Sequence, residues 1–191
     1  MKINLLEVVF ITMIDNNFIL ELNQLSVDIT KISDVWIDEN KPSTTNIING
    51  NYYPGTMKMG YPTDPVLYEF AKKFNKKLFD NNFKFMIIQL RPGEELVPHI
   101  DQRRNASINL IIRGDVKSTP IRYYNDNKAI NPIYEYYYNN YPVIISTKQF
   151  HGSKNETNVE RILFSIDISP EYTFSQLKEQ WLNNKNFFID N

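Results

Sequence analysis

Short segments with a hydrophobic period of two fill the second half of the chain, and turn-forming residues separate them. Successive side chains of a β-strand point to opposite faces, so this alternation is typical of strands that lie between two different environments. In residues 161–168 every second position is apolar, and the positions between them are mixed: Arg161, Leu163, Ser165 and Asp167. We expect a sheet that packs on helices with one face and lines a polar pocket with the other.

The same pattern predicts seven short strands, at 83–90, 97–101, 106–113, 121–124, 133–138, 143–146 and 161–168. Seven strands of this length, with turns between them, are typical of a β-sandwich or a barrel. The fold class that we predict is therefore mainly β with flanking helices. At 191 residues the chain fits one domain.

Two helices are expected beside the strands. Asp64 and Pro65 are a typical N-cap and first helical residue, and apolar residues recur at three- and four-residue spacing after them. We therefore predict a helix over 64–80. A second helix is expected over 173–185, because Thr173 and Gln176 have the spacing of a capping box.

The first 62 residues are expected to form an N-terminal scaffold and a possible lid. The apolar run 5–11 is too short for its period to distinguish a strand from a helix. Residues 40–62 contain several glycines and prolines, which predicts an irregular segment. The strand-rich core is expected over 83–168.

The composition excludes several classes of site and partner. The chain has no cysteine, so a metal would need nitrogen and oxygen ligands. The net charge of −1 gives no electrostatic footprint for nucleic acid or for an anionic membrane. The longest apolar stretch, 5–14, is far shorter than the ~20 residues of a membrane span. We expect a cytoplasmic protein that binds neither nucleic acid nor membrane, and nothing indicates its oligomeric state.

The chain has only two histidines, and their positions suggest a metal site. Asp101 follows His99 by two residues, so both side chains share one face of an extended segment. His151 comes 52 positions after His99 (151 − 99). Two imidazoles and one carboxylate make the facial triad of non-haem Fe(II) oxygenases, so His99, Asp101 and His151 are our candidate metal ligands and catalytic centre. The alternative is that both are ordinary core or surface histidines.

These residues resemble the 2-oxoglutarate and Fe(II)-dependent oxygenases. The motif of that superfamily is His-x-Asp/Glu, a second histidine some tens of residues later, and a basic residue about ten further on. Here the pattern is His99-Ile100-Asp101, His151 and Arg161. Among subfamilies the chain is most similar to the aspartyl/asparaginyl β-hydroxylase and proline hydroxylase branch. The resemblance covers residues 83–170 well and the first sixty poorly.

The resemblance implies a double-stranded β-helix, a cupin-like jelly roll, with Fe(II) held by the triad. It also implies that Arg161 binds the distal carboxylate of the co-substrate 2-oxoglutarate, for which a planar, permanently charged guanidinium is suited. The alternative for Arg161 is a pair with a surface acid. Ser107 or Asn109 would add a hydrogen bond to the co-substrate, or both are plain residues of the pocket wall.

Three further residues have open interpretations. Asn155 either orients the loop that carries His151 or is a plain turn asparagine. Arg103 and Arg104 either meet an acidic substrate or form a solvated pair in a loop, and we favour the solvated pair.

The function that the resemblance implies is a dioxygenase that uses molecular oxygen and 2-oxoglutarate to hydroxylate a C–H bond, with release of succinate and carbon dioxide. Its partner would be a small-molecule or peptide substrate, an amino acid either free or within a peptide or protein. The alternative is a cupin-like metal-binding protein or a non-oxidative metalloenzyme that does not use 2-oxoglutarate. Cupins share a His-x-x-x-Asn ending, which His151 and Asn155 match, but their first motif normally has His-x-His. A third class is a catalytically silent jelly roll, which would leave the triad unexplained.

Overall fold

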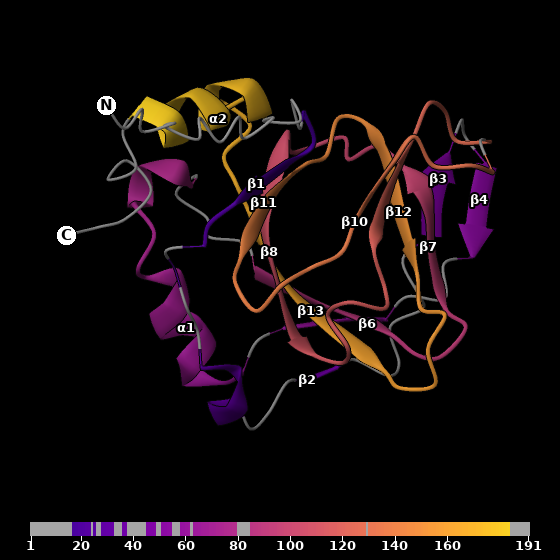
Figure 1. Cartoon of the computed structure of the whole chain (residues 1–191), viewed down its shortest axis with the longest axis horizontal. Helices are drawn as coiled ribbons and strands as arrows, with labels where there is room; N and C mark the ends of the chain where they lie inside the picture. Colours follow the sequence, from indigo (N-terminus) through magenta and orange to yellow (C-terminus); the bar gives the residue numbers. More distant parts are fainter. Residues whose placement is uncertain are drawn as a thin grey trace, which may run out of the picture.

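The computed structural model describes residues 17–23, 25, 28–32, 36–37, 45–48, 51–54, 58–61, 63–79, 85–128 and 130–183. Two antiparallel sheets, a separate β-hairpin and the helices beside them make up this part of the chain (Figure 1). The larger sheet has seven strands, in the order β1 (Ile19–Glu21), β11 (Val143–Ser146), β8 (Ala106–Arg113), β13 (Arg161–Asp167), β6 (Phe85–Leu90), β5 (Lys58–Tyr61) and β2 (Trp36–Ile37). The smaller sheet has four, in the order β10 (Tyr134–Tyr136), β9 (Ile121–Tyr124), β12 (Phe150–Lys154) and β7 (Glu95–His99). A separate hairpin joins β3 (Thr45–Ile48) to β4 (Asn51–Pro54).

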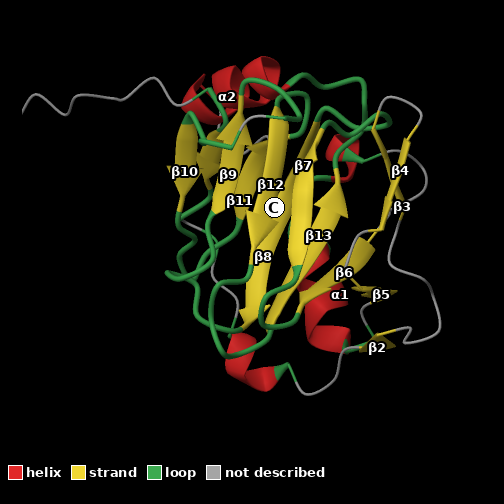
Figure 2. Cartoon of the chain, turned by 90° about the vertical axis from the view of Figure 1, so that its right-hand side faces the viewer, coloured by secondary structure: helices red, strands yellow, loops and turns green. Residues whose placement is uncertain are grey.

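The strand order is that of a double-stranded β-helix. From β6 to β13 the chain passes from one sheet to the other at each step, except at the β9–β10 hairpin. Figure 2 shows the smaller sheet in front of the larger one. The predicted fold class, mainly β with flanking helices in a jelly roll, is therefore confirmed.

The outer face of the larger sheet packs on two α-helices, α1 (Pro65–Ala71) and α2 (Phe174–Asn183), which lie on the side away from the smaller sheet (Figure 1). The buried cluster between them contains Phe70 of α1 and Trp181 of α2, together with Ile162, Phe164 and Ile166 of β13. Full burial of an aromatic or branched side chain contributes about 1.5–3 kcal/mol. This layer covers the outer face of the larger sheet.

The inner faces of the two sheets enclose a second buried cluster. Leu163 lies between Ile162 and Phe164, which belong to the outer cluster. Its side chain packs in the inner cluster with Ile88 of β6 and Tyr123 of β9. Arg161 and Ser165 of the same face are also buried. The two faces of β13 thus have the two environments that its alternation predicts.

The helix predicted over 64–80 is shorter than expected. The N-cap is as predicted, with the Asp64 side chain accepting from the Val66 N–H at 2.8 Å, but α1 ends at Ala71 and a 3-10 turn, η2 (Lys76–Leu78), follows. The Asn75 side chain accepts a hydrogen bond from the Lys77 N–H and begins that turn. Short polar side chains that bond to nearby backbone compete with the helical ladder in this way.

The predicted C-terminal helix appears as α2, and its capping box is present. The Thr173 N–H donates to Gln176 Oε1 at 2.8 Å, and the Gln176 N–H donates to Thr173 Oγ1 at 3.3 Å. Residues 184–191 lie outside the described part. No helix in the described ranges is both long and apolar enough to cross a membrane.

The prediction of an irregular segment over 40–62 is wrong in part, because β3, β4 and β5 lie in it. Pro54 ends β4, whereas Gly60 lies within β5 and pairs with Ile87 of the larger sheet. The 3-10 turn η1 (Ile29–Lys31) precedes this region. The apolar run 5–11 lies outside the described residues, and the lid role stays a prediction.

Candidate metal centre

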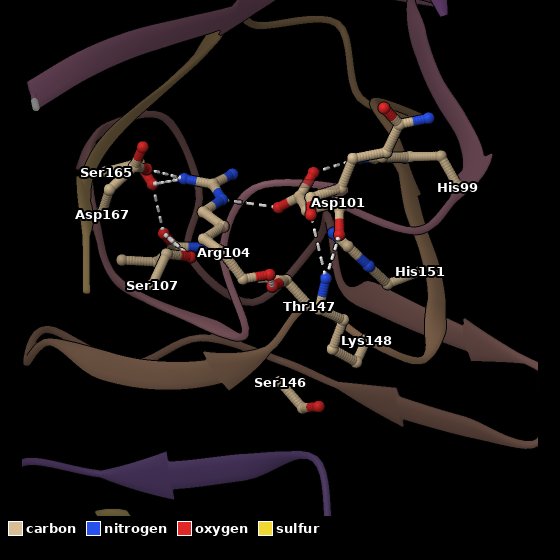
Figure 3. A network of polar contacts seen from close by, with 12 residues as sticks. His99, Asp101, Arg104, Ser107, Ser146, Thr147, Lys148, His151, Ser165 and Asp167 are labelled. Atoms are coloured by element: carbon tan, nitrogen blue, oxygen red, sulfur yellow. Dashed lines mark hydrogen bonds and ion pairs between the residues drawn. The ribbon is translucent and has the colours of Figure 1, made fainter. Parts of the chain in front are cut away.

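The three predicted ligands come together at the inner face of the smaller sheet. β7 and β12 are antiparallel neighbours, and His99 lies directly opposite His151 in their register. The ring centroids are 4.4 Å apart, and His99 Nε2 lies 3.4 Å from Asp101 Oδ1. One ligand atom from each of the three residues lies within 4.8 Å of the others. His99 ends β7, Asp101 follows it and His151 lies in β12, and Figure 3 shows these three residues close to one another.

A glycine allows the two histidine strands to approach closely. A Cβ atom on Gly152 would lie 2.6 Å from the Leu96 carbonyl oxygen of β7, which is shorter than such contacts permit. The register between β12 and β7 also shifts between His151 and Ser153. Such a shift re-aims a side chain without ending the pairing. It therefore belongs to the local structure that places His151.

Both imidazoles are oriented by backbone carbonyls. His99 Nδ1 lies 2.9 Å from the Val97 carbonyl oxygen, and His151 Nδ1 lies 2.9 Å from that of Gln149. When Nδ1–H donates to these carbonyls, each Nε2 keeps a free lone pair. Burial, followed by the charge of His99, lowers the pKa of His151 to about 3, so this ring is neutral near pH 7. A neutral imidazole is the form that binds a metal.

The Asp101 carboxylate is held ionised. Burial raises its pKa, but the hydrogen bond with His99 and the charge of Arg104 outweigh burial and hold the pKa well below its usual range. Arg104 Nε donates to Asp101 Oδ2 at 2.5 Å. The Asp101 backbone N–H donates to the Thr147 carbonyl at 3.0 Å, which anchors the segment after β7. An anionic oxygen therefore stands beside two imidazoles, a donor set that suits Fe(II) or a similar divalent ion.

The expectation that Arg103 and Arg104 form a solvated pair is wrong for Arg104. Arg103 is exposed, but the Arg104 side chain is only 13% exposed. Arg104 contacts Asp101 through Nε, and its Nη1 pairs with Asp167 at the end of β13. The two neighbouring arginines therefore have different roles.

A cavity of about 220 Å³ opens from the triad into the space between the sheets. Apolar side chains from both sheets form much of its wall, among them Ile88, Leu96 and Leu163. Arg161 lines the same cavity. The structure thus brings the predicted ligands and the predicted co-substrate residue to one cavity.

Arg161 is buried without an acidic partner. Its side chain is only 4% exposed, and none of the described carboxylates lies within salt-bridge distance of it. Arg161 Nη1 donates to Ser153 Oγ at 2.6 Å, the guanidinium carbon lies 5.1 Å from the Tyr138 ring centroid, and Nε has no partner. Burial lowers the pKa of Arg161. The alternative of a pair with a surface acid therefore fails for this residue.

Asn109 and Ser107 occupy different positions around the cavity. Asn109 lines it, whereas Ser107 lies behind and donates to Asn109 Oδ1 at 3.2 Å. Ser165 Oγ donates to the same oxygen at 2.8 Å, and Asn109 Nδ2 lies 3.5 Å from Tyr138 Oη. The geometry therefore leaves Asn109 as a possible ligand contact and makes Ser107 its support.

Asn155 is a turn residue. Its Nδ2 donates to the Leu90 and Val159 carbonyls, at 2.9 and 2.8 Å, and its Oδ1 accepts from Thr157 Oγ1 at 2.7 Å. These bonds fasten the 155–159 turn to the end of β6. The side chain contacts none of the three candidate ligands, so of the two interpretations the turn asparagine agrees with the structure.

Four residues of this site were missed by sequence reasoning, namely Arg104 as a buried residue, Tyr138, Ser153 and Asp167. The alternation of residues 161–168 did place Asp167 on the pocket face. For Tyr138 and Ser153 the chain carries no comparable signal, because only the packing of the two sheets brings them to Arg161.

No family model matches the sequence, and no curated protein is similar to it. Several solved structures are similar in part. A cupin domain from Bordetella pertussis is 14% identical, covers 48% of this chain and 86% of its own, and has a TM-score of 0.35. The viral collagen prolyl hydroxylase of Paramecium Bursaria Chlorella virus-1, solved with 2-oxoglutarate, is 14% identical over 59% of this chain and 78% of its own, with a TM-score of 0.38. A Pseudomonas putida prolyl-4-hydroxylase is 10% identical over 59% and 70%, with a TM-score of 0.41. Similarities of this size carry no functional argument.

Proposed function

We propose that this chain is an Fe(II)- and 2-oxoglutarate-dependent dioxygenase that hydroxylates a C–H bond. The observation that carries the proposal is Arg161, a buried guanidinium without an acidic partner that shares a cavity with the triad. A buried charge is costly unless an opposite charge pairs with it. The distal carboxylate of 2-oxoglutarate would be that partner. A metal site without this co-substrate would leave the arginine unexplained.

The residues present fit both groups. His99, Asp101 and His151 would hold the ion, since their donor atoms already converge. Arg161, kept in place by Ser153 and Tyr138, would bind the carboxylate, and its unpartnered Nε is one free donor. When bound, Fe(II) with 2-oxoglutarate and oxygen supplies the oxidation of a C–H bond, with release of succinate and carbon dioxide.

The protein's own contribution is orientation and exclusion of water. The carbonyls of Val97 and Gln149 fix the two imidazoles, and Arg104 fixes the carboxylate. The apolar side chains of both inner faces limit water in the cavity, which strengthens charge interactions there. An amino acid, free or within a peptide or protein, is the substrate class that we propose, on the resemblance of the His-x-Asp and histidine-to-arginine motifs alone.

The decisive experiment is an anaerobic titration of the Fe(II)-loaded protein with 2-oxo acids. Chelation of a 2-oxo acid by Fe(II) gives a weak visible charge-transfer band, which serves as the readout. We expect 2-oxoglutarate to produce the band at much lower concentration than 2-oxobutyrate, which lacks the distal carboxylate. Succinate release that depends on an added amino acid or peptide would then identify a substrate.

Each result has a clear meaning. Equal affinity for the two 2-oxo acids would refute the role of Arg161. Binding of Fe(II) without any band would favour a cupin-like metal protein that does not use 2-oxoglutarate. The Asp101→Ala variant lacks one proposed metal ligand and tests whether the band requires the bound ion. It should give no band with either 2-oxo acid.

A further inference from the structure

Arg104 connects the candidate metal ligand Asp101 to the far side of the cavity. It lies three residues after Asp101, and its guanidinium stands between that carboxylate and Asp167 of β13 (Figure 3). We infer that Arg104 is a positioning residue: it fixes which oxygen of Asp101 faces the two imidazoles, and Asp167 holds Arg104 in place. The inference rests on the metal site of the proposed function.

The two oxygens of Asp101 have separate partners. Oδ2 accepts from Arg104 Nε at 2.5 Å, while Oδ1 lies 3.4 Å from His99 Nε2. A carboxylate without such a contact can rotate and exchange its two oxygens. A charge-assisted hydrogen bond to one of them restricts that rotation and leaves the other toward the histidines. The same contact occupies the oxygen that would otherwise allow Asp101 to bind an ion through both oxygens.

Arg104 makes three further contacts, with Asp167, Ser165 and Thr147. Its Nη1 pairs with Asp167 and lies 3.4 Å from Ser165 Oγ, both on β13 of the larger sheet. Its backbone carbonyl accepts from Thr147 Oγ1 at 2.8 Å. The side chain is only 13% exposed, so water competes little for these bonds. The guanidinium therefore ties the ligand segment after β7 to the opposite sheet.

The charges agree with a positioning role. Asp167 neutralises Arg104, so the pair orients Asp101 without adding net positive charge beside a divalent ion. The planar fork of arginine presents Nε and Nη1 to two carboxylates at once, whereas lysine has a single nitrogen. A lysine at 104 would keep the charge but lose one of the two contacts.

Co(II) binding tests this inference, because calorimetry gives the affinity and the visible d–d bands report the geometry of the ligands. We expect Arg104→Gln to weaken Co(II) binding about 10- to 100-fold, as the loss of partners that orient metal ligands usually does. Arg104→Lys should recover part of the affinity but not the wild-type spectrum. Asp167→Asn should weaken binding less, because the contact between Arg104 and Asp101 remains.

The matched control is Arg122→Gln. Arg122 is also held by two carboxylates, Glu135 at 2.7 Å and Glu156 at 3.0 Å, and it lies on β9 of the smaller sheet without contacting the triad. Its loss should leave the affinity and the spectrum unchanged. A general effect of removing a doubly paired arginine would appear in both variants.

Folded Arg104→Gln and Arg104→Lys variants with wild-type affinity and wild-type bands would overturn the inference. If neither variant folds, Asp167→Asn decides, and an unchanged affinity and spectrum in it would overturn the inference equally. If wild-type protein binds no Co(II), the metal site and the proposed function fail together with it. Wild-type binding with unaffected variants refutes the role of Arg104 alone.

Discussion

Replacing Arg161 with Met should stabilise the metal-free protein while it removes affinity for 2-oxoglutarate. The guanidinium is 4% exposed, lacks an acidic partner among the described residues and leaves Nε unbonded. Replacing buried ionic groups with apolar side chains of similar volume is neutral or stabilises by about 1–4 kcal/mol. Because the stem of Arg161 is already buried, the Met side chain adds little further apolar burial. The lost bond to Ser153 and the lost contact with Tyr138 place the expected gain in the lower part of that range. We expect a net gain of about 1–3 kcal/mol, or roughly 2–12 °C in Tm for a domain of this size.

The loss of binding follows from the same burial. Truncating one partner of a buried, hydrogen-bonded charge pair costs about 2–5 kcal/mol, which is about a 30- to 4000-fold increase in Kd. Thermal unfolding followed by circular dichroism, first in EDTA and then with Mn(II) and increasing 2-oxoglutarate, measures both effects. Wild-type Tm should rise with the ligand concentration, and the Tm of the variant should not.

The control for this prediction is Arg113→Met. Arg113 is half exposed and pairs with Glu160 at 3.0 Å, so its replacement should neither stabilise the protein nor change ligand binding. An Arg161→Met protein that is less stable than wild type by more than about 1 kcal/mol would show that the arginine is a structural residue. Unchanged affinity for 2-oxoglutarate in that variant would refute the assignment of the carboxylate site.

Three further outcomes are expected. Asp101→Ala and His151→Ala should each abolish Co(II) binding, measured by calorimetry. Both variants should keep the far-ultraviolet circular dichroism of a folded protein. Wild-type affinity in either variant would refute the assignment of the triad. In EDTA the protein should lose stability as the pH falls below about 6.5. Burial holds the pKa of His151 at about 3 in the folded protein, whereas the unfolded chain takes up the proton near 6.5. Urea unfolding at pH 7 and 4.5 tests this, and the stability of His151→Asn should depend less on pH. Gly152→Ala should destabilise the protein by about 1–3 kcal/mol and weaken metal binding, because the new Cβ meets β7. Gly114→Ala is strained by its φ of +101° and by Glu160, so it should destabilise the protein without changing metal affinity. Equal metal affinities in both glycine variants would count against the role of Gly152.

Sequence patterns predict best the bounds of those strands whose own residues show a strand-like hydrophobic pattern. β8, β9 and β11 have the predicted bounds, since each alternates or is uniformly apolar and is flanked by turn formers. β12 was not predicted, because Phe150–Lys154 has one large apolar residue and no β-branched one. Pairing with β7 on one side and β9 on the other makes it a strand, which is a tertiary effect.

The features of the site likewise divide into those that the local sequence predicts and those that depend on the fold. The spacing of His99 and Asp101 is local and readable, whereas their meeting with His151 depends on the pairing of β7 with β12. Arg103 and Arg104 are equivalent in the sequence, and only the position of Asp167 on β13 distinguishes them. Residue types therefore predict the chemistry of the centre, and the contacts that tune it come from the fold.

One feature of the sheets bears on how an ion would leave. In the described part of the chain β7 is the edge strand of the smaller sheet, and it joins that sheet only through β12. An ion shared by His99, Asp101 and His151 would cross-link this edge as a disulfide does, closing a loop of about fifty residues. Amide hydrogen exchange along β7 should then slow when metal is added, with the inner strands of the larger sheet as an unaffected reference. Release of the ion would then require β7 to separate from β12. The rate of this local opening would set how long the protein retains the metal.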